Sequence, residues 1–236
     1  MRPARDRATI SYFGEFDSAD RAREDLPSGW EEARKVTSIL VDAATPKDGY
    51  TADHALEVAR LSRLVGMDLG LNEEELEWLV HGALLHDVGK LIVADEILEK
   101  LGTLTEEEWV VVKRHPEVGA RMIEPLEVLS GALPVIRHHH ERPDGTGYPA
   151  GLEGEEIPIA ARIVAAVDAY GVMLRGRPYR PNRYRPNRYR PKSSLAEALK
   201  ELRREAGRQF DGRVVVAMGR VLGDSKTSSS DSPRTL

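Results

Sequence analysis

The stretch WLVHGALLHDVGK, from Trp78 to Lys90, decides the fold of this chain. Apolar side chains recur at i, i+3, i+4, i+7 and i+8 through its first half and the turn before it, at Leu76, Leu79, Val80, Ala83 and Leu84. This spacing predicts an amphipathic helix whose apolar stripe faces the core. Asn72 followed by Glu75 has the spacing of a capping box, so the helix is expected to begin there.

His86 and Asp87 lie at the far end of this stripe. A buried imidazole and a buried carboxylate cost free energy unless they are paired, and a metal ion would satisfy both. If the helix continues, with some loosening at Gly89, Lys90 shares their side. A pair of metal ligands beside a cation suits an anionic substrate such as a phosphate ester. An isolated His-Asp dipeptide is more often a plain hydrogen-bonded pair, so the metal interpretation depends on the rest of the chain.

The composition restricts the chemistry of any metal site. The 236 residues are 41% hydrophobic and 31% charged, which fits one large domain, or one and a half small ones, with a sizeable core. A net charge of -5 argues against a general nucleic-acid binder, so no DNA partner is expected. The chain has no cysteine, which excludes thiolate ligands and leaves imidazole, carboxylate and water.

The ends of the chain differ from its middle. Residues 1–29 lack periodic apolar residues and are expected to form a partly ordered arm, residues 30–222 form one folded domain, and residues 223–236 read as a disordered tail. No apolar run approaches the roughly 20 residues that span a bilayer. The N-terminus also lacks the apolar region of a secretory signal. A cytoplasmic protein without membrane insertion is therefore expected.

Further candidate ligands occupy unusual places on the predicted helices. His54 opens an apolar stripe that continues through Val58 and Val65. Pro116 disfavours helical geometry at His115, which should therefore lie at a break after a helix that Thr105 and Glu108 cap. For each histidine alone, a hydrogen-bonded core position is the commoner role.

A helix that begins at about Leu126 or Pro134 is predicted to run into three consecutive histidines, His138 to His140. A long loop with the sequence ERPDGTGYPAGLEGEEIP follows them. On a helix, consecutive side chains point roughly 100° apart, so two adjacent histidines can flank one metal site but three cannot. The loop is either an ordinary surface loop or a functional one, as loops of this length often are. In the apolar helix predicted from Ile157 to about Leu174, Asp168 is a lone carboxylate that needs a partner.

A tandem repeat follows this helix in the segment RGRPYRPNRYRPNRYRPK, from Arg175 to Lys192. Arginine interleaved with tyrosine suits phosphate contacts and base stacking. The alternative is a solvated, proline-rich linker, and it is the preferred interpretation for the second and third copies. Two helices, at about 193–206 and 209–222, are predicted after the repeat.

Together these pieces resemble the HD-GYP family, a branch of the HD superfamily of metal-dependent phosphohydrolases. In chain order they are TADH at His54, LLHDVGK at His86 and Asp87, KRHPEVG at His115, HHERPDGTGYP from His139 to Pro149, AAVDAY at Asp168, and RPYR from Arg177 to Arg180. The resemblance covers about residues 35 to 220, and the HHE…DGxGYP piece is specific to this branch.

The resemblance implies an all-α fold, an HD-domain helical bundle with additional C-terminal helices. It implies hydrolysis of the bacterial messenger cyclic di-GMP to pGpG or GMP at a site of two or three iron or manganese ions. General metal chemistry predicts that the attacking group is a hydroxide bridging two of the metals. Iron or manganese suits the all-N/O donors. The metal ligands it implies are His54, His86, Asp87, His115, His139, His140 and Asp168.

The catalytic residues expected from general metal chemistry are Asp87 and Lys90. Lys90 would contact the substrate and neutralise charge that builds up on the phosphate. By resemblance, Tyr148, Arg177 and Arg180 would hold the nucleotide through stacking and bidentate contacts. A signalling protein as partner and a homodimer are both left open by the sequence.

Two departures from the family pattern bear on metal count and substrate. Tyr50 stands where some members carry a glutamate that recruits a third metal, so two metals are expected. Gly171 replaces an acid that resembles a base-recognition residue. The alternatives to cyclic di-GMP hydrolysis are therefore hydrolysis of another cyclic dinucleotide or a nucleotide, and a non-catalytic module that senses cyclic di-GMP or docks a partner.

Overall fold

The computed structural model describes residues 12–13, 29–44, 52–100, 102–175 and 193–223, and these contain helices and no β-strand. The predicted all-α fold is therefore confirmed. The α-helices are α1 (Trp30–Ala44), α2 (Ala52–Asp68), α3 (Glu73–Leu85), α4 (Asp95–Leu98), α5 (Glu106–Lys113), α6 (His115–Ile123), α7 (Leu133–His138), α8 (Ile159–Arg175), α9 (Leu195–Arg204) and α10 (Gly212–Val221). Short 3-10 turns occupy η2 (Val88–Ile92), η3 (Glu127–Ala132) and η4 (Gly154–Glu156).

Helix α3 is the centre of the bundle. It begins with the predicted capping box, in which the Asn72 side chain accepts from the Glu75 N–H and the Glu75 side chain accepts from the Asn72 N–H. The expected apolar stripe is buried, but so is every residue from Leu79 to Leu85. The prediction of a one-sided helix was wrong for this half, because α3 contacts α1, α2, α7, α8 and η3.

The α3 helix ends one residue before His86. We expected it to continue and to loosen at Gly89, but the chain turns into η2 directly after Asp87. A Cβ atom at Gly89 would lie 2.0 Å from the carbonyl oxygen of His115. The η2 backbone therefore packs against the start of α6, which a longer α3 helix with side chains on every face could not do.

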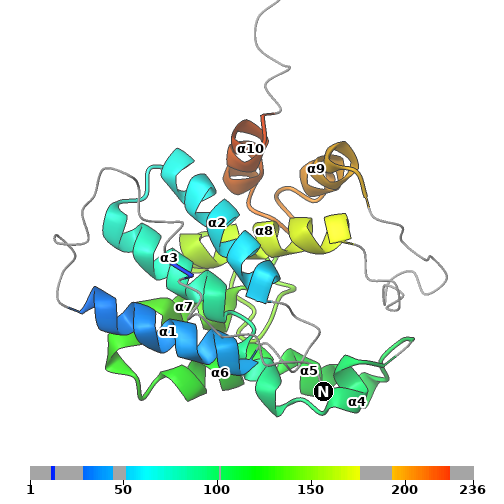
Figure 1. Ribbon diagram of the computed structural model, residues 1–236. Coiled ribbons are helices and arrows are strands. Elements are labelled where there is room, and N and C mark those ends of the chain that lie inside the picture. The colour runs from blue at the N-terminus through cyan, green and yellow to red at the C-terminus, as the bar shows by residue number, and fades with distance from the viewer. Residues whose placement is uncertain (1–11, 14–28, 45–51, 101, 176–192, 224–236) are drawn as a thin grey trace, which may run out of the picture.

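The remaining helices lie above and below α3 in the view of Figure 1. Helix α2 packs between α3 and α8, and α9 and α10 lie above them in Figure 1, while α1 and α6 lie below. The two C-terminal helices occur where we expected them, although each is shorter than predicted. None of the described helices combines the length and the apolarity that crossing a lipid bilayer requires.

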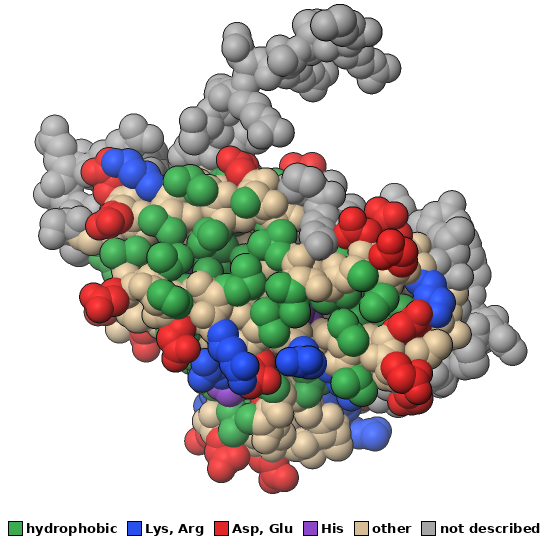
Figure 2. All heavy atoms as spheres, turned by 90° about the horizontal axis from the view of Figure 1, so that it is seen from below, with side chains coloured by type: hydrophobic (Ala, Val, Ile, Leu, Met, Phe, Trp, Pro, Cys, Tyr) green, Lys and Arg blue, Asp and Glu red, His purple; other side chains and the backbone are tan. Residues whose placement is uncertain are grey.

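Hydrophobic side chains also reach the surface. Viewed from below, they gather across the middle of the molecule, with charged side chains around them (Figure 2). Helices α1, α5 and α6 each carry a large exposed hydrophobic residue, Ile39, Val110 and Met122. Of the predicted N-terminal arm, the structure describes Tyr12 and Phe13, which are buried against the core, and Gly29.

The C-terminal helices are joined to the bundle by a nearly buried ion pair. Arg162 of α8 donates to the Asp211 carboxylate, with Nη1 and Oδ2 2.5 Å apart, and Asp211 also caps α10 through the Arg213 N–H. Burial alone would raise the pKa of Asp211, but these hydrogen bonds and the Arg162 charge lower it. The bonded carboxylate therefore stabilises the fold at neutral pH, and the effect is lost as the pH falls through the lowered pKa.

Replacing Asp211 with alanine should reduce the free energy of unfolding by about 2–4 kcal/mol at neutral pH, because it removes a helix cap and leaves Arg162 without its buried partner. The matched control is Asp68→Ala, which breaks a more exposed ion pair between α2 and Arg220 of α10 and should cost less than about 1 kcal/mol. Denaturant unfolding measures both. The Asp211→Ala deficit should shrink below the ordinary carboxyl pKa of 3.8, and a deficit unchanged in acid would contradict this account.

Candidate metal centre

Three imidazoles sit at helix ends and bond to the backbone in the same way. His86 follows α3, His115 follows α5 by two residues, and His139 follows α7. Each Nδ1 lies close to the carbonyl oxygen three residues earlier, at 2.7 Å from Ala83, 2.8 Å from Val112 and 3.0 Å from Ile136. The last carbonyls of a helix lack intrahelical partners, so each ring N–H caps its helix. Each Nε2 consequently keeps its lone pair for a ligand.

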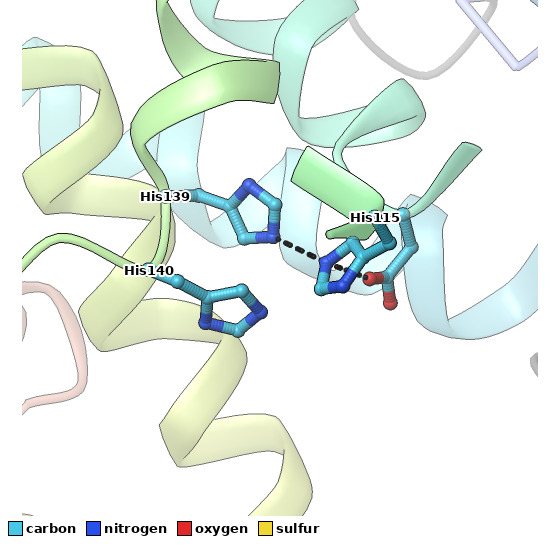
Figure 3. Close-up of side chains that lie close together, drawn as sticks. His115, His139 and His140 are labelled. Carbon is cyan, nitrogen blue, oxygen red and sulfur yellow. Dashed lines mark hydrogen bonds and ion pairs between the residues drawn. The ribbon is translucent and has the colours of Figure 1, made fainter. Parts of the chain in front are cut away.

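One cluster of possible ligands contains Asp87, His115, His139 and His140, whose donor atoms lie within 4.8 Å of one another. His115 Nε2 is 3.2 Å from Asp87 Oδ1 and 3.3 Å from His139 Nε2. Figure 3 shows the three imidazoles turned towards a common point. If both Nδ1 atoms carry the proton, the facing Nε2 atoms of His115 and His139 are both acceptors, and a cation is the partner that satisfies both.

A second cluster contains His54, His86 and Asp168, again with donor atoms within 4.8 Å of one another. His54 extends from α2 and Asp168 from α8, and His54 Nε2 lies 2.9 Å from Asp168 Oδ1. The lone carboxylate of the apolar α8 helix thus has a partner 114 positions earlier in the chain.

Asp87 connects the two clusters. One of its oxygens faces His115 in the first cluster, and the other lies 3.4 Å from His86 Nε2 in the second. Lys90 Nζ is 2.7 Å from this second oxygen, on the 3-10 turn η2. The structure therefore brings all seven predicted ligands into two adjoining groups, with a carboxylate between them and an ammonium at the edge.

The electrostatics keep most of these side chains in the protonation state that metals require. Burial and the neighbouring imidazoles lower the pKa of His139 far below its usual range, and burial and His115 lower the pKa of His140 to about 3. Burial opposes ionisation of Asp87, but Lys90 and the nearby imidazoles hold its pKa well below the ordinary value. Neutral imidazoles and ionised carboxylates are the ligand forms of these side chains.

His86 differs from the other histidines. Burial is the largest single effect and disfavours its charged form. The charge of Asp87, the hydrogen bond to Asp87, the charge of Asp168 and the Ala83 carbonyl together outweigh burial and raise the pKa of His86. The Asp87 carboxylate thus favours positive charge beside it. With nitrogen and oxygen donors only, both clusters fit a divalent cation of borderline or hard character.

Two histidines that we left out of the ligand set lie outside both clusters. His81 is fully buried in the core, where Thr37 Oγ1 lies 2.7 Å from its Nδ1, and burial lowers its pKa to about 3. His138 is the last residue of α7, with its Nδ1 3.6 Å from Glu141. The helix that we expected to run through all three consecutive histidines ends at His138, so His139 and His140 are presented by a turn.

The predicted substrate residues fall into two groups. Lys90 lies at the centre, and the Tyr148 ring stacks on His140 with centroids 4.8 Å apart. Arg177, Arg180, Tyr50 and the repeat after Tyr179 lie outside the described residues.

Glu141 is a residue of this region to which we had assigned no role. Its side chain is buried and accepts hydrogen bonds from three consecutive backbone N–H groups, those of Ala150, Gly151 and Leu152. The signal in the sequence was the glycine-rich loop itself, whose backbone donors need an acceptor when the chain folds back on itself.

This chain is similar in sequence to known proteins. A family model described as an HD domain matches residues 34–214. The chain belongs to the HD-GYP branch of the HD-domain family. This HD-GYP chain is 39% identical, over 80% of its length and 48% of the relative's, to the cyclic di-GMP phosphodiesterase response regulator RpfG of Xanthomonas campestris. It is 38% identical, over 60% of its length and 30% of the relative's, to the 3'3'-cGAMP-specific phosphodiesterase 3 of Vibrio cholerae.

A solved structure supports the fold assignment. The HDG"Y"P protein Bd1817 from Bdellovibrio bacteriovorus superposes with a TM-score of 0.57 at 18% identity, covering 85% of this chain and 74% of that one. The HD-GYP chain spans about half, or less, of the length of the curated relatives named above.

Proposed function

We propose that this HD-GYP chain is a metal-dependent phosphodiesterase that hydrolyses cyclic di-GMP to pGpG, GMP or both. The observation that carries this proposal is the convergence of seven nitrogen and oxygen ligands into two adjoining groups joined by Asp87. We further propose one metal ion in each group, with iron or manganese as the natural occupants of an all-N/O site. The relatives named as cyclic di-GMP phosphodiesterases support this choice of substrate.

The residues of the chain have distinct roles in this reaction. His115, His139 and His140 would hold one metal and His54, His86 and Asp168 the other, with Asp87 shared. Two metal ions would lower the pKa of a water molecule and clamp the phosphodiester for in-line attack. Hydrolysis adds the water oxygen to phosphorus and breaks the P–O3′ bond, so that one phosphate monoester and one free hydroxyl result.

Lys90 is positioned to stabilise the negative charge that develops on the phosphate. Its ammonium is nearly buried and bonds to Asp87, which keeps it beside the clusters. An ammonium carries three N–H donors, so it can bond to a phosphate oxygen while it remains on Asp87. In a partly desolvated site this charge stabilises the transition state more strongly than it would in water.

A second candidate substrate is another cyclic dinucleotide, and Gly171 is the observation that favours it. A Cβ atom at this position would lie 3.4 Å from Cε1 of His54, so any side chain here would stand directly beside the second cluster. This chain therefore lacks, next to the centre, the carboxylate that the resemblance links to base recognition. The relative named as a cGAMP-specific phosphodiesterase makes 3'3'-cGAMP the first alternative to test.

The proposal is tested by turnover. The chain, loaded with Mn²⁺ or with Fe²⁺ under anaerobic conditions, should convert cyclic di-GMP to pGpG or GMP, and the His86→Ala/Asp87→Ala double variant should not. Chromatography of parallel reactions with cyclic di-GMP, 3'3'-cGAMP and cyclic di-AMP identifies the preferred substrate and the product. Faster turnover of 3'3'-cGAMP would support the second candidate, whereas tight binding of cyclic di-GMP without any product would favour a sensor or a docking module.

A further inference from the structure

In the structure the Tyr148 ring contacts a side chain of the protein itself, His140, whereas we expected it to contact the nucleotide. Its ring stacks on His140 with an interplanar angle of 28°, and the ammonium of Lys113 lies over the ring, 5.4 Å from its centroid. The Tyr148 N–H also donates to the carbonyl oxygen of His140, at 3.2 Å. Tyr148 is thus joined to His140 through both its side chain and its backbone.

His140 needs such a support more than the other histidines do. The rings of His86, His115 and His139 are each fixed by a backbone carbonyl. Within the described part of the chain, no hydrogen bond fixes the His140 ring, which is held by ring contacts instead. These are the stack on Tyr148, an edge contact with His115 and a tilted contact with His139, the last two at centroid distances of 5.0 and 4.2 Å.

Glu141 determines where the Tyr148 ring can lie. Its carboxylate holds the loop at Ala150, Gly151 and Leu152, starting two residues after Tyr148. On the other side of Tyr148, a Cβ atom at Gly147 would lie 2.4 Å from the backbone nitrogen of Arg142. The loop is consequently folded against its own start on both sides of Tyr148.

We propose that Tyr148 is a positioning residue for His140, and that Glu141 holds it in place by binding the loop that carries it. The inference rests on the proposed metal centre, and it gives Tyr148 a role in metal binding that stacking on a nucleobase would not require. Removing the ring should weaken metal binding in the cluster of Asp87, His115, His139 and His140 and leave the other cluster unchanged.

The test compares Tyr148→Leu with Tyr148→Phe, which keeps the ring and removes only the hydroxyl. Mn²⁺ is titrated into metal-free protein, and the free ion is followed by its paramagnetic resonance signal. We expect two sites in the wild-type chain and in Tyr148→Phe, and a dissociation constant about 10–100-fold higher at one site in Tyr148→Leu. Thr146→Ala, an exposed substitution in the same loop, is the matched control and should bind as the wild type does.

A second variant guards against a fold defect in Tyr148→Leu. Glu141→Gln keeps an acceptor for the Ala150 N–H but turns an amide donor towards the N–H groups of Gly151 and Leu152, so it should weaken the same site with the aromatic ring intact. Two unchanged Mn²⁺ sites in folded Tyr148→Leu, with a raised KM for cyclic di-GMP, would overturn the inference and leave Tyr148 as a base-stacking residue. A wild-type chain that binds no Mn²⁺ would instead overturn the metal centre itself.

Discussion

Asp87→Asn should lower kcat for the preferred cyclic dinucleotide by about 10³-fold or more. Asp87 is the carboxylate that faces both ligand groups, with His115 3.2 Å from one oxygen and His86 3.4 Å from the other. Metal ions contribute several kcal/mol to phosphodiester cleavage, and about 4 kcal/mol corresponds to about 10³ in rate. The asparagine amide has one neutral oxygen and one NH2 group, which only donates hydrogen bonds, so it can face a cation on one side only.

Metal content distinguishes this effect from damage to a single site. Asp87→Asn should reduce the metal of both groups, as measured by elemental analysis after dialysis, whereas His54→Ala should remove about one equivalent. His138→Asn is the matched control, because His138 directly precedes two proposed ligands but lies outside both clusters. Two full equivalents of metal in Asp87→Asn would show that this carboxylate does not connect the sites.

Gly89→Ala should be the most destabilising substitution of a small residue near the centre. The added Cβ would lie 2.0 Å from the carbonyl oxygen of His115 and 2.6 Å from the backbone nitrogen of Gly119. Overpacking usually costs about 1–3 kcal/mol when side chains can yield, and here the neighbouring atoms belong to the backbone of α6. We therefore expect a loss of at least about 3 kcal/mol in the free energy of unfolding, together with a displaced His115 and weaker metal binding.

Gly212→Ala provides the control for this substitution. Gly212 is the first residue of α10, and a Cβ atom there meets no other atom within 4 Å. Alanine costs less backbone entropy than glycine in a helix, so Gly212→Ala should be neutral or slightly stabilising. Denaturant unfolding of the two variants measures the difference, and equal stabilities would contradict the close packing of η2 on α6.

Local rules were sufficient to predict most helices of this chain. The capping boxes at Asn72 and Thr105 both form, because each involves only residues within one turn. A break occurs next to Pro116, but it lies at Arg114, one residue earlier than expected, and His115 is the first residue of α6. The resemblance to a family supplied the set of ligands, since no local pattern relates His54 to Asp168, which belong to different helices.

Features that depend on tertiary packing could not be predicted in this way. The close approach of η2 to α6 decides where α3 ends. Contacts with five neighbouring elements bury the whole second half of α3. Whether a histidine faces the centre or the core is also a tertiary property. His81 and His86 lie on or directly after the same helix, yet only His86 joins a ligand group. Glu141 gave no signal by itself, because its partners are backbone atoms of a loop nine to eleven residues later.

The carbonyl contacts of His86, His115 and His139 constrain how this centre can change in evolution or by design. At these three positions an aspartate or glutamate would supply an oxygen to the metal but would leave the preceding helix without its ring N–H donor. A new ligand there would therefore have to compensate for a loss of helix capping. His140 caps no helix carbonyl. Of these four histidines it is therefore the one whose replacement by an oxygen donor should cost no helix capping. A change in the preferred metal by such an exchange is accordingly most feasible at this position.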